Sequence, residues 1–528
     1  MEFLYSYEDL TVGRRCLRQL RQRLDSRSGL RRPVGPQDFL EYPSGSAATH
    51  QFLERYRLEQ AYIRAFSAEV PDSEIIFPGS MACVMEQSPC DLEDILALSR
   101  RALEDFSEKR IPALVNGFFR CGNRLIRIDR LLRNPDGMII LELAKSASKI
   151  KDGYVREAGW NLQGLESLGV RPDEISVLLL NRDRSGSDEP FYRPMRQKRR
   201  HKFIRQDADG ELQGILQALD ADELPSCGSE YCDLCSDDQP KANDWGSIHN
   251  LHKSGGLSRK LSEQGILWVD ELDQVKSPLR EKLKAQHWIQ HRVEKTGEEH
   301  IDVTALRRFL EGLEWPLYFI DFECFLEALP SWSGVGIWEH APFLYSLYRM
   351  DRTLTVTRLD HYYMPPGEDR RREMAAQLIR DIGKSGSVLV YGIHFERAVI
   401  SRLAASLADL APKLEAVIER LVDLQTPFAE FAYYHPHQSG KISLKILLPI
   451  LTEHDYDSSR VSSGSDAFVG YYYLMHPELL VESEWDPYAS QVRRDPGGFA
   501  REVVEYCDTD AYGLAFLIKA LMQKAGLS

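Results

Sequence analysis

The sequence predicts an α/β protein made of more than one domain. The chain has 528 residues, which is enough for about two to four domains with a large combined core. Strand-like apolar runs alternate with stretches of helical periodicity in two separate regions, one within residues 1–245 and one from residue 313 onward. The two regions differ in the order of their strands and helices, so we expect two different α/β folds.

The composition is ordinary for a soluble globular protein. Hydrophobic residues make up 43% of the chain and charged residues 28%. No run of about 18 apolar residues is present, and the first residues lack the apolar core of a signal peptide. Nine cysteines without a regular framework speak against a secreted disulfide scaffold. We therefore expect a cytoplasmic protein without a membrane span. The net charge of −14 excludes a general nucleic-acid coat, but it permits a local basic channel.

The first region, residues 1–245, reads as helices followed by a strand meander. Two helical stretches before residue 70 are separated by a Pro-, Gly- and Ser-rich segment, and a further helix is expected at 91–108. Three strands follow, "ALVNGFFRC", "RLIRIDRLL" and "GMIILELAK". The turns between them, "GN" and "NPDG", are hairpin signals. A helix at 152–168 and the strand "ISVLLLNRD" complete this region.

Two acids of this meander, Asp129 and Glu142, are expected side by side on paired strands. Such carboxylates suit Mg²⁺ or Mn²⁺, which prefer oxygen ligands and which nucleases use to polarise a phosphate and activate water. A lysine two residues after Glu142 would point to the same face of the strand. That position holds Ala144, and Lys145 points to the opposite face unless a bulge intervenes.

The stretch "ELAKSASKIKDGY" resembles the Glu-Val-Lys-Ser-Ser-x-Ser-Val-Lys-Asp-Tyr stretch of a family of predicted RecB-family nucleases. That family belongs to the PD-(D/E)xK superfamily, which also holds the related CRISPR-adaptation nucleases. The resemblance implies a restriction-endonuclease-like core with a metal site at Asp129 and Glu142. Three interpretations of Ala144 stay open. It is an engineered inactivation, a natural loss that leaves a binding module, or the neighbour of a bulge that lets Lys145 serve.

The same resemblance implies two further site residues. The family's glutamine on the following helix corresponds to Asn161 or Gln163 in this chain. An acid or histidine on the early helices is also expected, and Glu54 and Glu59 are the candidates.

A basic segment, "RPMRQKRRHKFIRQ", lies at 193–206 and has seven Lys or Arg among its residues. Aromatic residues adjoin it, which is typical of an arm that contacts phosphates and stacks on bases. The alternative is a solvated basic loop. The residues that we expect to contact nucleic acid are Arg196, Lys198, Arg199, Arg200 and Lys202.

Three cysteines in "CGSEYCDLC", Cys227, Cys232 and Cys235, lie close together in a polar stretch. Clustered thiolates are typical ligands of zinc or of an iron–sulfur cluster, and either needs a fourth ligand. The RecB-like resemblance implies a 4Fe–4S cluster with Cys16 as the fourth ligand. Zinc stays open, as do unligated thiols and a replacement of Cys16 by Cys83 or Cys90. Apart from that alternative, the remaining cysteines, Cys83, Cys90, Cys121, Cys324 and Cys507, read as packing residues.

The second half of the chain begins with a helical connector at 246–312 and continues as an α/β unit at 313–528. Three strands are expected first, "PLYFIDFECF", "APFLYSLYRM" and "LTVTRLDHYYM". A helix at 367–383, the strand "SVLVYGIHF" and further helices follow to the end of the chain.

Four acids of this unit are expected to converge. Asp321 and Glu323 are two residues apart and share one face of a strand. Glu396 follows a later strand, and Tyr506 and Asp510 share one face of a helix because they are four residues apart. Four such acids can hold two metal ions about 3.5–4 Å apart, the arrangement that cleaves phosphodiesters.

The pattern Asp-x-Glu, a later acid and Tyr-x-x-x-Asp resembles the RNase H-like exonucleases of the DEDD type. The resemblance implies that Asp321, Glu323, Glu396 and Asp510 bind Mg²⁺ or Mn²⁺ and that Tyr506 orients the attacking water. The departure is Glu396, because those exonucleases usually have Asp there. The family of predicted RecB-family nucleases joins both units.

These observations lead us to expect a metal-dependent nuclease, with DNA as the favoured substrate and 3′ to 5′ trimming at the second unit. The alternative is a nucleic-acid-binding scaffold, or a subunit of a DNA-processing or phage-defence complex, with partly dead nuclease folds. No Walker-type GxxxxGK[ST] motif is present, so any motor or NTPase would be a partner protein.

Overall fold

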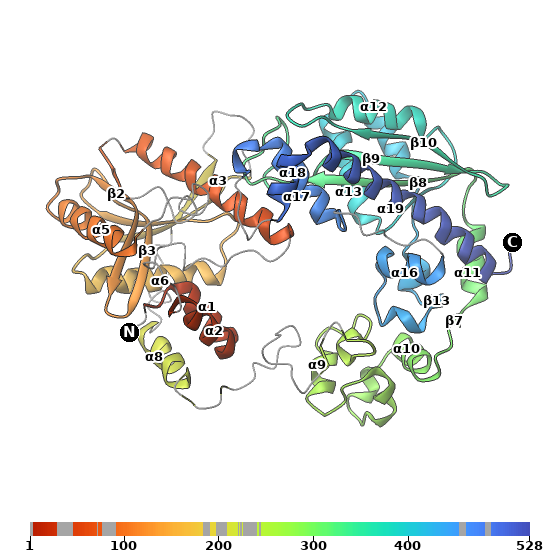
Figure 1. The fold of residues 1–528 in the computed structure, drawn as a ribbon, viewed down its shortest axis with the longest axis horizontal. Coiled ribbons are helices and arrows are strands. Elements are labelled where there is room, and N and C mark those ends of the chain that lie inside the picture. Colours follow the sequence, from red (N-terminus) through yellow and green to blue (C-terminus); the bar gives the residue numbers. More distant parts are fainter. Residues whose placement is uncertain are drawn as a thin grey trace. The chain divides into compact units, whose positions relative to one another are not determined.

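The computed structural model describes residues 4–28, 46–70, 72–76, 91–182, 191–196, 208–219, 221, 224, 240–241, 244–452, 461–480 and 487–527. The chain forms two compact units (Figure 1). Unit 1 contains Met1–Cys227, Leu326–Glu339 and Glu478–Pro487. Unit 2 contains Gly228–Phe325, His340–Pro477 and Tyr488–Ser528. Both units combine helices with a mixed sheet, which confirms the α/β class at that level.

Unit 1 is built on a six-stranded sheet in the order β1-β2-β3-β4-β5-β6. The predicted meander is confirmed: β2, β3 and β4 pair antiparallel, and β4 then pairs parallel with β5. Gly137, with a φ of 85°, supplies the left-handed turn before β4. An additional strand, β6, includes the first residues of the basic segment. The strands are β1 (Glu74–Ile75), β2 (Ala113–Cys121), β3 (Arg124–Arg133), β4 (Ile139–Ala144), β5 (Glu174–Leu180) and β6 (Tyr192–Arg196).

Helices pack on this sheet through apolar stripes. α5 begins at its N-cap Asp91 and packs its apolar side, which includes Leu96 and Phe106, against β2. α1 begins with a capping box between Ser6 and Asp9. The described helices of unit 1 are α1 (Tyr7–Arg15), α2 (Leu17–Ser28), α3 (Ser46–Glu69), α5 (Leu92–Ser107), α6 (Asp152–Ser167) and α8 (Ala208–Leu219).

Unit 2 contains a five-stranded sheet in the order β10-β9-β8-β11-β12. β8 lies at the centre: it pairs antiparallel with β9 and parallel with β11. Residues on both of its faces are buried, which fits a central strand. The strands are β8 (Leu317–Phe325), β9 (Ala341–Met350), β10 (Val356–Tyr363), β11 (Val388–Val390) and β12 (Leu421–Asp423).

The last helix, α19 (Pro496–Lys524), packs against β8 and β9. Leu514, Leu517 and Ile518 enter one core with Leu317 and Phe319 of the central strand. The other helices of the α/β part are α12 (Arg371–Asp381), α13 (His394–Ser406), α14 (Ala411–Ile418), α15 (Thr426–Ala429), α16 (Leu444–Leu451), α17 (Gly464–Met475) and α18 (Pro487–Arg494), with the 3₁₀ turn η5 (Pro436–Gln438). The 3₁₀ turn η6 (Pro477–Leu479) has two of its three residues in unit 1.

The predicted helical connector, residues 246–312, falls within unit 2 and has a small apolar core of its own around Leu261 and Leu272. β7 (His300–Ile301) of this part pairs with β13 (Tyr433–Tyr434). Its helices are η2 (Ile248–Asn250), α9 (Leu257–Ser262), η3 (Val269–Gln274), η4 (Arg280–Lys282), α10 (Ala285–Thr296) and α11 (Val303–Glu311). Within the described part of the chain, no helix is long and apolar enough to cross a membrane.

Candidate functional site

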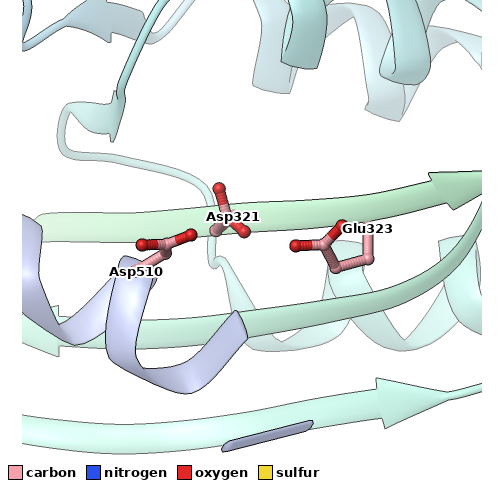
Figure 2. A group of neighbouring side chains, drawn as sticks. All are labelled: Asp321, Glu323 and Asp510. Atoms are coloured by element: carbon pink, nitrogen blue, oxygen red, sulfur yellow. The ribbon is translucent and has the colours of Figure 1, made fainter. Parts of the chain in front are cut away.

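A cluster of three carboxylates lies in unit 2. Asp321 and Glu323 are two residues apart on β8, and Asp510 comes from α19, which packs on that strand. One carboxylate oxygen from each residue lies within 4.8 Å of the other two. Figure 2 shows the two strand residues beside the helical one, with Asp321 between the others in this view. The structure thus brings together three of the four acids that the sequence predicts.

Burial and mutual repulsion make it unfavourable for all the carboxylates of this cluster to be ionised without a bound cation. Burial, together with the charges of Asp510, Glu323 and Glu396, raises the pKa of Asp321 well above its usual range. Burial and the charge of Asp510 raise the pKa of Glu323 to about 8, while Lys445 opposes that rise. Carboxylates that stay close together in a buried site favour protonation or a bound cation.

Glu396 lies in the first turn of α13, just after β11. It is buried, and burial raises its pKa to about 8. Its Oε2 atom has no hydrogen-bond partner among the described residues, and its charge acts on Asp321. It stands outside the group of three whose oxygens lie within 4.8 Å. A buried carboxylate oxygen without a hydrogen-bond donor is unusual in proteins, and it suits a metal ligand.

Asp423 fixes the turn that carries Glu396. Its carboxylate accepts hydrogen bonds from the backbone N–H groups of Gly392 (3.0 Å), Ile393 (3.2 Å) and Gln425 (2.9 Å). Because Asp423 ends β12 beside β11, these bonds hold the start of α13 against the sheet. Asp423 is therefore a positioning residue for Glu396.

Tyr506 lies one helical turn before Asp510 and hydrogen-bonds to it. Burial and the nearby acids raise the pKa of Tyr506, so its phenol keeps its proton. The Lys445 ammonium lies 5.1 Å from the centroid of the Tyr506 ring. The predicted pair of Tyr506 and Asp510 thus lies at the carboxylate cluster.

Two cysteines adjoin the cluster, although the sequence suggests only packing roles for them. The Cys507 thiol donates to Asp321 Oδ2 over 3.5 Å. Burial raises the pKa of Cys507 and of Cys324 well above the usual range, and the cluster's acids raise both further, so both stay thiols. The sequence signal was their position, since each directly follows a predicted site residue, Glu323 or Tyr506.

A second polar site, in unit 1, is a pocket of about 350 Å³ lined by parts of α1, α3, β2, β3 and α6. Asp129, Ala144 and Lys145 all line it. Asp129 Oδ2 accepts a hydrogen bond from the Ala144 backbone N–H at 2.8 Å, and Lys145 Nζ lies 2.6 Å from Glu157 Oε1. The charges of Glu157 and Asp129 raise the pKa of Lys145 despite its burial, so it stays a cation.

Glu142 does not join this pocket. It pairs across the strands with Arg130, so its side chain shares a face with Arg130 and not with Asp129. Arg130 Nε lies 2.7 Å from Glu142 Oε2, and its Nη1 lies 2.8 Å from Glu69 Oε2. The structure therefore keeps Glu142 in an ion-pair network and does not bring it together with Asp129.

The same register, continued by one residue, sets Leu143 opposite Asp129. Leu143 is buried in the core of unit 1. Lys145 is two residues after Leu143, so strand alternation points it to the same face as Asp129, and no bulge is needed for it to reach the pocket. This geometry favours Lys145 as the site lysine and leaves an apolar residue where a second carboxylate would be needed beside Asp129.

The structure also separates the alternative candidates of unit 1. Glu59 lines the pocket and lies 2.6 Å from Arg127 Nη2. Glu54 does not line the pocket, and it forms an ion pair with Arg57 at 2.8 Å. Asn161 lines the pocket and donates to the Arg127 carbonyl at 2.7 Å. Gln163 does not line it.

Glu157, Arg127 and Asn116 are among the pocket residues that sequence reasoning missed. Asn116 has a φ of 59° within β2, where the β2–β3 ladder is interrupted opposite Asp129. Left-handed backbone at a non-glycine residue stores strain and is found at functional sites. The signal available beforehand was the Asn-Gly pair inside a strand.

The remaining predicted residues lie largely outside the described part of the chain. Cys16 is described: it is buried at the end of α1, and its Sγ accepts from the Gln19 N–H at 3.5 Å. Arg196 is the last residue of β6, and the structure describes its backbone but not its side chain. The residues not described are Cys83, Cys90, Lys198, Arg199, Arg200, Lys202, Cys227, Cys232 and Cys235.

Comparison with known proteins gives one family match. Residues 318–443, about a quarter of the chain, match the family described as "Domain of unknown function (DUF2779)". The matched range covers Asp321, Glu323 and Glu396 and ends before Tyr506. Searches of curated proteins and of solved structures give no match.

Proposed function

We propose that this chain is a metal-dependent nuclease whose hydrolytic site is the carboxylate cluster of unit 2. One observation carries the proposal: Asp321, Glu323 and Asp510 place carboxylate oxygens within 4.8 Å of one another, with Glu323 buried and the two aspartates half-buried. Such an arrangement is unfavourable without a cation and suits hard divalent ions.

The side chains fit Mg²⁺ or Mn²⁺. The three side chains whose ligand atoms cluster are all carboxylates, and Glu396 adds a buried oxygen that accepts no hydrogen bond from the described residues. When bound, such ions would polarise a phosphate and lower the pKa of an attacking water. Asp321, Glu323, Asp510 and Glu396 would hold them. Tyr506, which keeps its proton, would orient the water from its place beside Asp510.

The finer assignment of unit 2 as an RNase H-like exonuclease of the DEDD type is supported by the elements that carry these residues. Asp-x-Glu lies on a central strand, the next acid follows the neighbouring parallel strand, and Tyr-x-x-x-Asp lies on the last helix. By that resemblance we propose DNA as the substrate and 3′ to 5′ as the direction. The longer Glu396 takes the place of the usual Asp.

For unit 1 we propose a PD-(D/E)xK-type domain that binds nucleic acid without cutting it. Leu143 stands opposite Asp129, and Lys145 is paired with Glu157, so the described pocket holds no cluster of three metal-ligating side chains. We further propose that the basic segment contacts the nucleic acid. Cys16, Cys227, Cys232 and Cys235 would hold a 4Fe–4S cluster or zinc, and a motor or NTPase would be a partner protein.

The test compares the wild type with Asp321→Asn and Asp510→Asn on single- and double-stranded DNA and RNA, labelled at either end, with Mg²⁺, Mn²⁺ or EDTA. Asp409→Asn, an exposed acid of unit 2 that pairs with Arg372, is the matched control. Loss of a residue that merely supports a metal ligand costs about 10–100-fold, so loss of a ligand should exceed that. We expect the control to cut DNA and both cluster variants to be inactive. Equal cutting by Asp321→Asn and wild type would reject the assignment, and no cutting by any form would favour the binding scaffold.

A further inference from the structure

A lysine stands beside the carboxylate cluster of unit 2. Lys445 is the second residue of α16, and its ammonium lies 5.1 Å from the centroid of the Tyr506 ring. It also donates to the Ser462 carbonyl. Its charge acts directly on Glu323, where it opposes the rise in pKa that burial and Asp510 produce. Lys445 thus lies over the Tyr506 ring, close enough to the cluster for its charge to act on Glu323.

The segment that receives Lys445 is itself fixed in place. Asp466 accepts from the N–H and the hydroxyl of Ser462, both at 2.9 Å, and from the Tyr488 hydroxyl at 2.5 Å. The first turn of α17 then passes close to the cluster, because a Cβ on Gly464 would lie 3.4 Å from Glu323 Oε2. The lysine is therefore supported from α16, α17 and α19, and its position does not depend on a flexible stem alone.

The lysine cation at this position does not favour the binding of a metal ion. A positive charge next to Glu323 weakens the attraction of the cluster for Mg²⁺ or Mn²⁺. A phosphate held at those ions would bring negative charge, and a lysine ammonium is a common partner of phosphate oxygens. The start of a helix of twelve residues on the same side adds a further favourable field for an anion.

We propose that Lys445 is a substrate-binding residue of the unit 2 site and that its ammonium contacts the phosphate of the phosphodiester placed at Asp321, Glu323 and Asp510. The proposal rests on the proposed function and deepens it, because it assigns the recognition of the substrate phosphate to a residue outside the acid pattern. It also explains why the lysine lies over Tyr506, the residue proposed to orient the water.

The proposal predicts opposite effects of one substitution on two ligands. Lys445→Met keeps an unbranched side chain but removes the charge. Metal affinity should then stay equal or rise, whereas affinity for a phosphate ligand should fall. A lysine with a merely structural role would give a different result, since its loss would weaken both.

The experiment uses the full chain and two probes, Mn²⁺ alone and thymidine 5′-monophosphate at saturating Mn²⁺, both measured by titration calorimetry. The variants are Lys445→Met, Lys445→Arg and, as the matched control, Lys519→Met, whose ammonium lies 5.7 Å from the Phe516 ring. Because the ammonium would make a charge-assisted hydrogen bond to the phosphate, we expect at least about tenfold weaker nucleotide binding in Lys445→Met. Lys445→Arg keeps the positive charge and should bind the nucleotide more tightly than Lys445→Met, whereas Lys519→Met should bind it as tightly as wild type.

The outcomes separate this inference from the proposed function. If Lys445→Met binds Mn²⁺ normally and the nucleotide as tightly as wild type, the inference fails while the metal site stands. If Lys445→Met loses Mn²⁺ and nucleotide affinity in parallel, Lys445 is structural and the inference also fails. If the wild type does not bind Mn²⁺ at all, both proposals fail.

Discussion

At the scale of single residues, the two units show how a partner decides what a buried carboxylate can do. Glu142 lies 2.5 Å from an Arg130 guanidinium nitrogen and is already compensated. Glu323 is buried and Asp321 is half-buried beside other acids, and their pKa values are raised accordingly. The ion pair compensates the charge of Glu142, whereas a crowded group of acids is unfavourable until some of them are protonated or a cation binds.

The first prediction concerns pH and follows from Glu323. Its pKa is about 8 in the folded protein against roughly 4.3 in an unfolded chain, so the folded state binds the proton more tightly. Its contribution to stability is complete below the unfolded value and is lost as pH rises through the folded value. The free energy of unfolding of the metal-free wild type should therefore fall, relative to Glu323→Gln, between about pH 5 and pH 8.

Urea unfolding of both proteins in EDTA at several pH values measures this difference. In Mg²⁺ or Mn²⁺ the pH-dependent gap should shrink, because a bound cation removes the reason for protonation. A gap that widens in the wild type's favour as the pH rises in EDTA would contradict the raised pKa.

At the scale of elements, the register between strands determines which face of the sheet a residue occupies, and the local sequence does not reveal that register. The meander, its turns and the helix after it follow from local signals, and they are confirmed within one or two residues at most ends. The face that Glu142 occupies follows instead from its pairing with Arg130. A shift of one residue exchanges the two faces of a strand, so the local pattern "LELAK" is compatible with either arrangement. In unit 2, by contrast, Asp321 and Glu323 are two residues apart on one strand, so they share a face in any register.

The second prediction tests the position of Leu143. Leu143→Glu would place a carboxylate opposite Asp129, next to Lys145. Without metal it should destabilise the protein by about 2–5 kcal/mol, because it replaces a core leucine by a buried acid. Mn²⁺ should restore part of that loss. Ala144→Lys, the change that the sequence pattern alone would suggest, should create no metal-dependent gain.

Thermal unfolding with and without Mn²⁺ measures both variants, each in an Asp321→Asn background so that the unit 2 cluster does not contribute. An Mn²⁺-dependent rise in melting temperature for Ala144→Lys but not for Leu143→Glu would contradict the register argument.

The third prediction concerns the turn between β11 and α13. Asp423→Ala removes three acceptor contacts to backbone N–H groups and should cost about 1–3 kcal/mol of stability. Because that turn positions Glu396, Mn²⁺ affinity should fall as well. Asp423→Asn keeps a side-chain acceptor and should lose less in both measurements. Titration calorimetry and urea unfolding give the two values, and an Asp423→Ala protein with wild-type Mn²⁺ affinity would show that Glu396 does not depend on this turn.

At the scale of the whole molecule, the sequence predicts two α/β units but not their full membership. Leu326–Glu339 follows β8 directly in the chain, yet it belongs to unit 1. Residues 246–312, read as a separate connector, cluster with unit 2. Such assignments depend on contacts between residues far apart in the sequence. Glu327 illustrates this, because it lies 2.9 Å from Arg57, which is 270 positions earlier.

The last prediction follows from this long-range contact within unit 1. Arg57 Nη1 lies 2.8 Å from Glu54 Oε1 and 2.9 Å from Glu327 Oε1, and both acids are almost fully buried. Arg57→Met would leave two buried carboxylates without this cation and should lower the free energy of unfolding by about 3–5 kcal/mol. Arg55→Met is the matched control, because Arg55 is half-exposed and 4.0 Å from Glu8, and it should cost less than about 1 kcal/mol.

A second step distinguishes lost charge compensation from lost packing. Adding Glu54→Gln and Glu327→Gln to Arg57→Met removes the uncompensated charges while keeping the side-chain shapes, so stability should recover in part. Denaturant unfolding of the single, control and triple variants measures this recovery. If the triple variant is no more stable than Arg57→Met, Arg57 acts through packing, and its charge does not stabilise the contact with Leu326–Glu339.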